Sequence, residues 1–166
     1  MKHLTNEGAK VWISDINAER VKEVAALYKT QVVEGDAIFD LDMDIYAPCA
    51  LGATVNDQTL SKLKCAIICG AANNQLADEK VHGEAIMKKG LIYAPDFVVN
   101  AGGLINVYNE LLGYNRERAM KQAETIYGNV AKVFQIAKAK NIPTYMAANQ
   151  MAEERIAAIG KVKLSY

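Results

Sequence analysis

The chain has 166 residues, of which 51% are hydrophobic and 23% are charged, and 19 lysine and arginine residues balance 19 aspartate and glutamate residues. This length fits one domain with a sizeable core, and the lack of a basic excess argues against nucleic acid as a partner. No apolar run approaches the roughly 20 residues of a membrane span, and no apolar signal core follows Met1. We therefore expect a cytoplasmic protein with no membrane partner.

The first two thirds of the sequence predict strands that alternate with helices. The helical segments are residues 17–28, with Val21, Val24, Ala25 and Tyr28 at helical spacing, and about 78–89. Short apolar runs predict strands at Lys10–Ser14, more weakly at Gln31–Val33, and then at Asp44–Ala47, Cys65–Cys69 and Leu91–Ala94. Strands that are apolar on both faces and separated by helices favour a mostly parallel sheet, so the predicted fold class is α/β.

The last third is predicted to be helical. Apolar residues between Ala119 and Ala137 step by four and three, which predicts a helix of about seven turns that ends at Asn141-Ile142-Pro143. A last helix is expected over Ala152–Val162. Met120, Tyr127 and Phe134 recur every seven residues, and we interpret this stripe as core rather than as an assembly surface. No linker separates the two parts, so we expect one domain, residues 1–166.

The cysteine and histidine content predicts no metal site. Cys65 and Cys69 lie four apart in a strand-like run, and with Cys49 the count is odd. We expect all three to be buried, reduced thiols. His3 and His82 stand alone, without further ligands at zinc spacing.

Asp15 is the first candidate binding residue. It follows the predicted strand 10–14, the place where dinucleotide-binding folds hold the cofactor ribose with a carboxylate, about 20 residues after a glycine-rich turn. Such a turn would fall before Met1. The alternative is that Asp15 only caps the helix that begins near Asn17.

Four other segments are candidates, and three of them directly follow predicted strands at the edge where open α/β sheets bind ligands. Pro48 and Pro95 each follow a run of Ile-Tyr-Ala. The alternative is that these two prolines only terminate strands. Gly70–Gln75 offers small residues and the amides of Asn73 and Asn74. Asn100–Leu104 places two glycines before a helix, which is weak evidence of an anion site.

The amino-acid sequences of five segments resemble the cofactor domain of the glutamate/leucine/phenylalanine/valine dehydrogenases. They are Asp44–Gly52 (DIYAPCALG), Gly70–Leu76 (GAANNQL), Tyr93–Gly103 (YAPDFVVNAGG), Gly113–Met120 (GYNRERAM) and Asn141–Ile156 (NIPTYMAANQMAEERI), the last being similar to the leucine-type members. The resemblance spans nearly the whole chain. It implies an NAD-binding domain with an incomplete Rossmann-like, doubly wound parallel sheet and a helical C-terminal tail.

The resemblance also implies a reaction and a set of residues. The reaction is NAD-dependent oxidative deamination of a branched-chain L-amino acid to its 2-oxo acid. Asp15 would bind the adenosine ribose and repel the 2′-phosphate of NADP. Ala50 and Leu51 would line the cofactor crevice, Asn74 and Asn100 would contact the nicotinamide and its ribose, and Leu104 and Val107 would touch the substrate side chain. Leu104 stands where the family usually has a smaller valine or isoleucine.

The resemblance further implies that the family's catalytic lysines and aspartate lie in a substrate domain that this sequence does not contain, so we assign no catalytic residue. The central strand and glycine-rich turn would also be missing. We expect the strands at 10–14 and 44–47 to pair directly, to expose a sticky edge, or to associate with another molecule, giving a homo-oligomer.

Three hypotheses about function stay open at this point. The first is a cofactor-domain part of a leucine-type dehydrogenase, inactive without the missing half. The second is a non-catalytic binding or assembly module that uses the helical tail as its surface. The third is a truncated product with no activity of its own.

Overall fold

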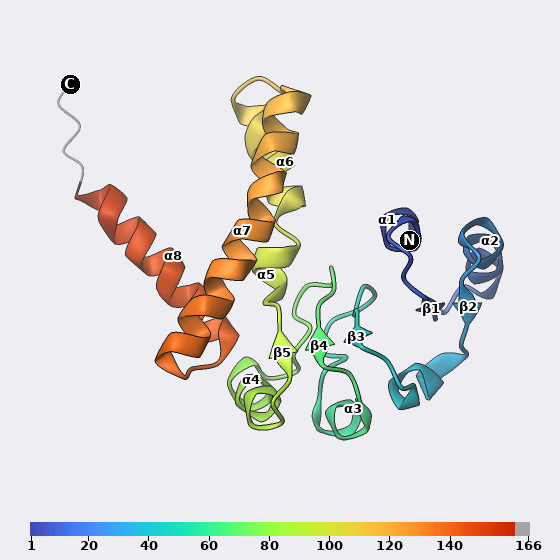
Figure 1. Cartoon of the computed structure of the whole chain (residues 1–166). Coiled ribbons are helices and arrows are strands. Elements are labelled where there is room, and N and C mark those ends of the chain that lie inside the picture. The colour runs from blue at the N-terminus through green and yellow to red at the C-terminus, as the bar shows by residue number, and fades with distance from the viewer. Residues whose placement is uncertain (162–166) are drawn as a thin grey trace.

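The computed structural model describes residues 1–161 and has the expected alternation of strands and helices (Figure 1). The strands are β1 Trp12–Ile13, β2 Gln31–Val32, β3 Ile45–Tyr46, β4 Ile67–Ile68 and β5 Ile92–Tyr93. The helices are α1 Lys2–Asn6, α2 Ala18–Tyr28, the 3-10 helix η1 Gly35–Asp40, α3 Asp57–Lys62, α4 Glu79–Lys88, α5 Asp96–Val99, α6 Gly102–Leu111, α7 Arg116–Lys140 and α8 Thr144–Gly160. The α/β class is confirmed, and each predicted strand contains an observed one.

The strands form two separate parallel sheets. β1 pairs with β2, and β4 lies between β3 and β5, with Ile67 opposite both Ile45 and Ile92. Within residues 1–161 no ladder joins β1 to β3, and the two sheets stand apart in Figure 1. Direct pairing of these two strands, one of the three expected outcomes, therefore does not occur. Each of them has one edge without a partner strand in the described chain.

The main core surrounds the three-stranded sheet. Ile68 of β4 and Val55, which precedes α3, are fully buried and pack with Leu60 of α3 and Ile86 of α4. A second cluster joins the two long helices through Val133 and Ala137 of α7 and Ala147 and Ala148 of α8. The two helices of the C-terminal tail, α7 and α8, therefore pack on each other, and α8 also contacts α4 and β5.

Local side chains set the ends of the predicted helices. Asn17 caps α2 by accepting the N–H of Arg20 at 3.0 Å, and Asn115 caps α7 by accepting the N–H of Arg118 at 2.9 Å. Asn141 ends α7 in the left-handed conformation, at φ 52°. The 25 residues of α7 amount to seven turns, so the predicted length is confirmed.

The sequence predictions for the tail were wrong in two respects. α8 begins at Thr144 rather than Ala152, because Pro143 provides a helix start and the first two turns bury Tyr145, Ala147 and Ala148. Val162, the predicted end of this helix, lies outside the described residues. In the seven-residue stripe on α7, Met120 is 53% and Tyr127 85% exposed, so these residues are surface and only Phe134 is partly buried.

The prediction of three buried thiols was also wrong. Cys65 is buried and Cys69 half-buried, but Cys49 is exposed because it follows Pro48 into the loop after β3. Burial raises the pKa of the Cys65 and Cys69 thiols, which keeps both in the neutral form. Among the described residues no three histidine, cysteine or acidic side chains are grouped as a metal would require, and no helix has the length and apolar character to span a membrane.

Candidate functional site

A pocket of about 640 Å³ lies at the carboxyl ends of β4 and β5, and we call it the strand-end pocket. Its walls come from the loop after β4, the start of α4, the segment from β5 through α5, and the first turn of α6. The lining residues are Asn73, Asn74, Gln75, Leu76, Glu79, Tyr93, Asp96, Phe97, Asn100, Ala101, Gly103 and Leu104. The pocket thus lies where ligands of open α/β sheets bind, as the strand ends predicted.

The loop after β4 is held tightly against the loop after β3. Gly70 packs on Pro48 so closely that a Cβ would lie 2.1 Å from the Pro48 carbonyl oxygen, so only glycine fits. Gln75 is fully buried, and its Nε2 donates to the carbonyls of Gly70 at 2.7 Å and Ala72 at 3.0 Å. These contacts fold residues 70–75 into a rigid turn that presents Asn73 and Asn74 to the pocket.

Asn74 has an unusual backbone conformation that two hydrogen bonds maintain. Its φ is 52°, in the left-handed region. Its carbonyl accepts the N–H of Ala53 at 2.7 Å, and its N–H donates to Oδ2 of Asp96 at 2.5 Å. Its side chain makes no hydrogen bond to any residue in 1–161, so the carboxamide is available to a ligand.

Asn100 is bound to the same loop from the other side. It ends α5, and its Nδ2 donates to Oδ1 of Asn73 at 2.5 Å and approaches the carbonyl of Ala71 at 3.4 Å. Asn74 and Asn100, predicted to act together, are thus brought into one pocket. Leu104, in the first turn of α6, also lines it and is 75% exposed.

The pocket lining also contains two acidic side chains, Asp96 and Glu79. The Tyr93 hydroxyl donates to Oδ1 of Asp96 at 3.2 Å. Burial, and then the charge of Asp96, raise the pKa of Tyr93, so the phenol stays protonated and acts as a donor. Burial, followed by the charge of Asp96, also raises the pKa of Glu79. No lysine, arginine or histidine is among the described lining residues.

The other predicted site residues lie outside this lining. Asp15 is exposed just beyond β1, where its Oδ1 accepts the N–H of Asn17 at 3.0 Å, while Asn17 itself is the helix cap. Ala50 and Leu51 are exposed in the loop after β3. Val107 is 55% exposed on α6. Their binding roles stay predictions.

Several pocket residues were not predicted from the sequence, namely Gln75, Glu79, Tyr93, Asp96 and Phe97. The sequence carried one usable signal for two of them. A tyrosine and an aspartate that flank Ala94-Pro95 are three residues apart, a spacing that allows a side-chain contact across a turn. The contact of Asp96 with Asn74, by contrast, joins residues 22 apart and could not be read locally.

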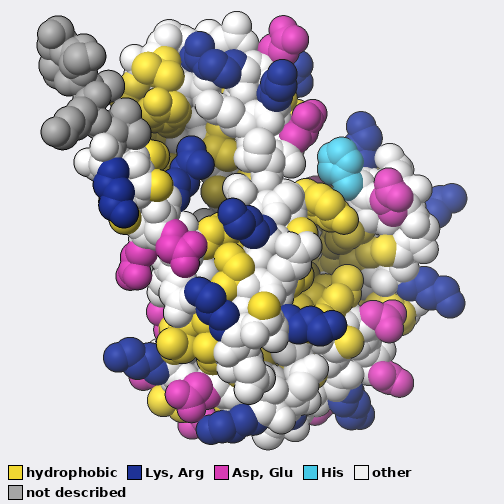
Figure 2. All heavy atoms as spheres, turned by 60° about the vertical axis from the view of Figure 1, so that its left-hand side comes forward, with side chains coloured by type: hydrophobic (Ala, Val, Ile, Leu, Met, Phe, Trp, Pro, Cys, Tyr) yellow, Lys and Arg dark blue, Asp and Glu magenta, His cyan; other side chains and the backbone are white. Residues whose placement is uncertain are grey.

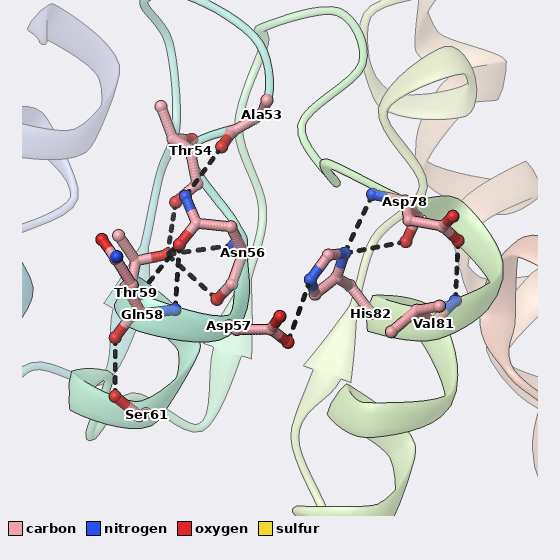
Figure 3. A network of polar contacts seen from close by, with 10 residues as sticks. All are labelled: Ala53, Thr54, Asn56, Asp57, Gln58, Thr59, Ser61, Asp78, Val81 and His82. Carbon is pink, nitrogen blue, oxygen red and sulfur yellow. Dashed lines mark hydrogen bonds and ion pairs between the residues drawn. The ribbon is translucent and has the colours of Figure 1, made fainter.

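A second polar network lies at the starts of α3 and α4 (Figure 3). His82 of α4 is 5% exposed; its Nδ1 lies 2.9 Å from both N and O of Asp78, and its Nε2 lies 3.4 Å from Oδ1 of Asp57 in α3. Asn56 caps α3 by accepting the N–H groups of Gln58 and Thr59. This network joins the starts of α3 and α4.

Comparison with known proteins agrees with this architecture. The profile of the Glutamate/Leucine/Phenylalanine/Valine dehydrogenase family matches residues 7–163. The chain is 53% identical to leucine dehydrogenase of Thermoactinomyces intermedius over 99% of its own length, and 46% identical to L-tryptophan dehydrogenase of Nostoc punctiforme over 93%. It also superposes on the crystal structure of L-tryptophan dehydrogenase from Nostoc punctiforme with a TM-score of 0.94, at 45% identity over 97% of this chain.

The match extends over only part of these relatives. The chain spans 45% of the leucine dehydrogenase and 48% of the crystallised tryptophan dehydrogenase chain. The family profile covers residues 7–163, which is more than half of this chain. This chain therefore belongs to the glutamate/leucine/phenylalanine/valine dehydrogenase family.

Proposed function

We propose that this chain is the NAD-binding part of an enzyme that oxidatively deaminates a branched-chain L-amino acid to its 2-oxo acid. The observation that carries the proposal is the 53% identity with a leucine dehydrogenase over 99% of the chain. A pocket at the carboxyl ends of β4 and β5, with amides in its wall, supports it. Bound NAD would supply the hydride acceptor, and the protein would supply binding and orientation.

The residues fit the parts of a dinucleotide in a consistent way. The Asp15 carboxylate beyond β1 suits the two ribose hydroxyls and would repel a 2′-phosphate, which favours NAD over NADP. Ala50 and Leu51, in the loop after β3, would line the crevice between Asp15 and the strand-end pocket. The carboxamide of Asn74 can both donate and accept, as the carboxamide of a nicotinamide requires, and Asn100 would contact the adjacent ribose.

The substrate side of the site is proposed on α6. Leu104 lines the pocket and Val107 lies one turn further along the same helix, and both are aliphatic and more than half exposed. An aliphatic wall suits an aliphatic amino acid, and it offers no hydrogen-bond partner for the side-chain carboxylate of an acidic amino acid. Tryptophan and phenylalanine dehydrogenases are also among the relatives, at 46% and 42% identity, so the volume near Leu104 is the feature to test.

Binding of cofactor to this chain can be measured directly. Calorimetric titration with NAD⁺ should give weak but detectable binding, and NADP⁺ should bind more weakly still. Asp15→Asn should remove the preference for NAD⁺, whereas Glu84→Gln, an exposed change on α4, should leave it unchanged. Equal binding of NAD⁺ and NADP⁺ by the wild-type chain would contradict the assigned role of Asp15. Tight NAD⁺ binding would instead favour a binding module with another phosphate site.

Activity of the chain alone is expected to be absent. The described lining of the strand-end pocket contains no lysine, and the relatives are about twice as long as the chain. The rate of NADH formation from L-leucine and NAD⁺, followed by absorbance, should therefore not exceed the rate without the chain. A substantial rate would show that the described residues already include a complete catalytic set.

An assembly role for the helical tail is a second candidate. Tyr127 and Met120 of α7 and Leu111 of α6 are large apolar side chains that are all more than half exposed. Figure 2 shows hydrophobic side chains exposed on several parts of the surface between charged ones. We propose that a second copy of the chain covers part of this surface, giving a homo-oligomer.

A further inference from the structure

Asp96 lies where three parts of the strand-end pocket meet. It is the first residue of α5, it follows β5 by three residues, and it faces the loop after β4. One carboxylate oxygen, Oδ2, accepts the backbone N–H of Asn74 at 2.5 Å. The other, Oδ1, accepts the Tyr93 hydroxyl at 3.2 Å. Both oxygens are therefore used by neighbouring pocket residues.

The bond to Asn74 acts on the backbone of that residue and not on its side chain. Asparagine adopts the left-handed region more readily than most residues with a Cβ, and at Asn74, with φ of 52°, two hydrogen bonds hold that conformation in place. Ala53 donates to the Asn74 carbonyl, and Asp96 accepts from the Asn74 N–H. The bond to Asp96 is made to an ionised group, so it is the stronger kind.

We propose that Asp96 is a positioning residue of the cofactor site: its carboxylate fixes the backbone of Asn74, so that the Asn74 carboxamide is held ready for the nicotinamide. This inference rests on the proposed role of Asn74 in cofactor binding. Asp96 acts through Asn74 and does not itself bind the cofactor.

The first test needs no cofactor. The backbone amide of Asn74 should give a downfield proton signal in the NMR spectrum of the ¹⁵N-labelled chain, because it donates to a carboxylate. In Asp96→Ala this signal should move upfield, and in Asp96→Asn, which keeps one acceptor oxygen, it should move less. Glu84→Ala, which removes an exposed carboxylate on α4, should leave it in place. An Asn74 signal that is the same in wild type and Asp96→Ala would overturn the inference.

The second test asks whether Asp96 acts through Asn74. NAD⁺ titrations of wild type, Asp96→Ala, Asn74→Ala and the double variant form a thermodynamic cycle. We expect Asp96→Ala to weaken NAD⁺ binding about tenfold in the wild-type background and by less than about twofold when Asn74 is already alanine. Equal losses in both backgrounds would mean that Asp96 supports the fold in general or contacts the cofactor, and would refute a positioning role.

The two tests separate this inference from the function on which it rests. If Asp96→Ala does not fold, Asp96→Asn takes its place in the cycle, with a smaller but still Asn74-dependent loss expected. If the wild-type chain does not bind NAD⁺, the proposed function fails and the cofactor half of the inference fails with it. The Asn74 amide signal still decides whether Asp96 fixes the Asn74 backbone.

Discussion

Gly83 provides the sharpest test of how the helical tail is joined to the sheet. It lies in α4 against the ring of Tyr145 in α8, and a Cβ placed on it would be 2.6 Å from both Cδ1 and Cε1 of that ring. Tyr145 is 7% exposed, so its ring cannot swing into solvent to make room. Gly83→Ala would raise helix propensity by about 1 kcal/mol, but overpacking of a buried contact costs about 2 to 3 kcal/mol. We therefore expect a net loss of stability of about 1 to 2 kcal/mol.

Gly128 in α7 supplies the matched control. It is also helical, but nothing lies within 4 Å of the Cβ that alanine would add, so Gly128→Ala should stabilise the chain by up to about 1 kcal/mol. Urea unfolding followed by far-UV circular dichroism measures both changes on one scale. The two substitutions should shift the midpoint in opposite directions. A shift toward higher stability in both would refute the close packing of α8 on α4.

The other expected changes concern one phenol, one helix cap and one exposed ring. The raised pKa of Tyr93 means that the folded chain holds a proton that the unfolded chain releases above about pH 10, so stability falls as pH rises through that value. Tyr93→Phe should make this alkaline decline shallower in urea unfolding at pH 8 to 11. Asn56→Ala removes the cap of α3 and should cost about 1 kcal/mol in the same assay at neutral pH, whereas an unchanged midpoint would contradict the capping contacts. Tyr127→Lys should reduce concentration-dependent association in sedimentation velocity, and a wild-type chain that is monomeric at all concentrations would contradict the proposed oligomer.

Helix ends were predictable where a neighbouring side chain or backbone conformation sets them. α2 begins after Asn17 and α7 ends at Asn141, as the sequence indicated. Both the side-chain cap and the left-handed end act within four residues, so a local pattern can reveal them. α3 has an equally local signal in the capping box of Asn56 and Thr59. The helix has only six residues, however, and its apolar pattern is too short to predict a helix. The first turns of α8 were missed because Ala147 and Ala148 become core only through contact with α7.

The candidate site was predictable only in part, for a similar reason. The strand-end position predicted the segment that holds Asn74, and the family resemblance added Asn100 and Leu104, which line the same pocket. The residues that give this edge its geometry act over long separations. Gly70 packs on Pro48 across two strands, and Asp96 reaches back over 22 residues to Asn74. Such contacts depend on register and on loop conformation, which no local pattern specifies.

The distribution of burial separates the two ends of the proposed cofactor site. Val21, at 5% exposed, is the one buried hydrophobic side chain among residues 1–44, whereas the three-stranded sheet and its helices supply a continuous core. The strand-end pocket is therefore preformed on a well-packed body. Asp15 lies on the thinly buried unit of β1, β2 and α2, whose sheet does not join β3. Under the proposed function, Asp15 and the asparagine amides would hold two ends of one cofactor, so we expect cofactor affinity to rise when the free edges of β1 and β3 are paired and the two sheets are held together.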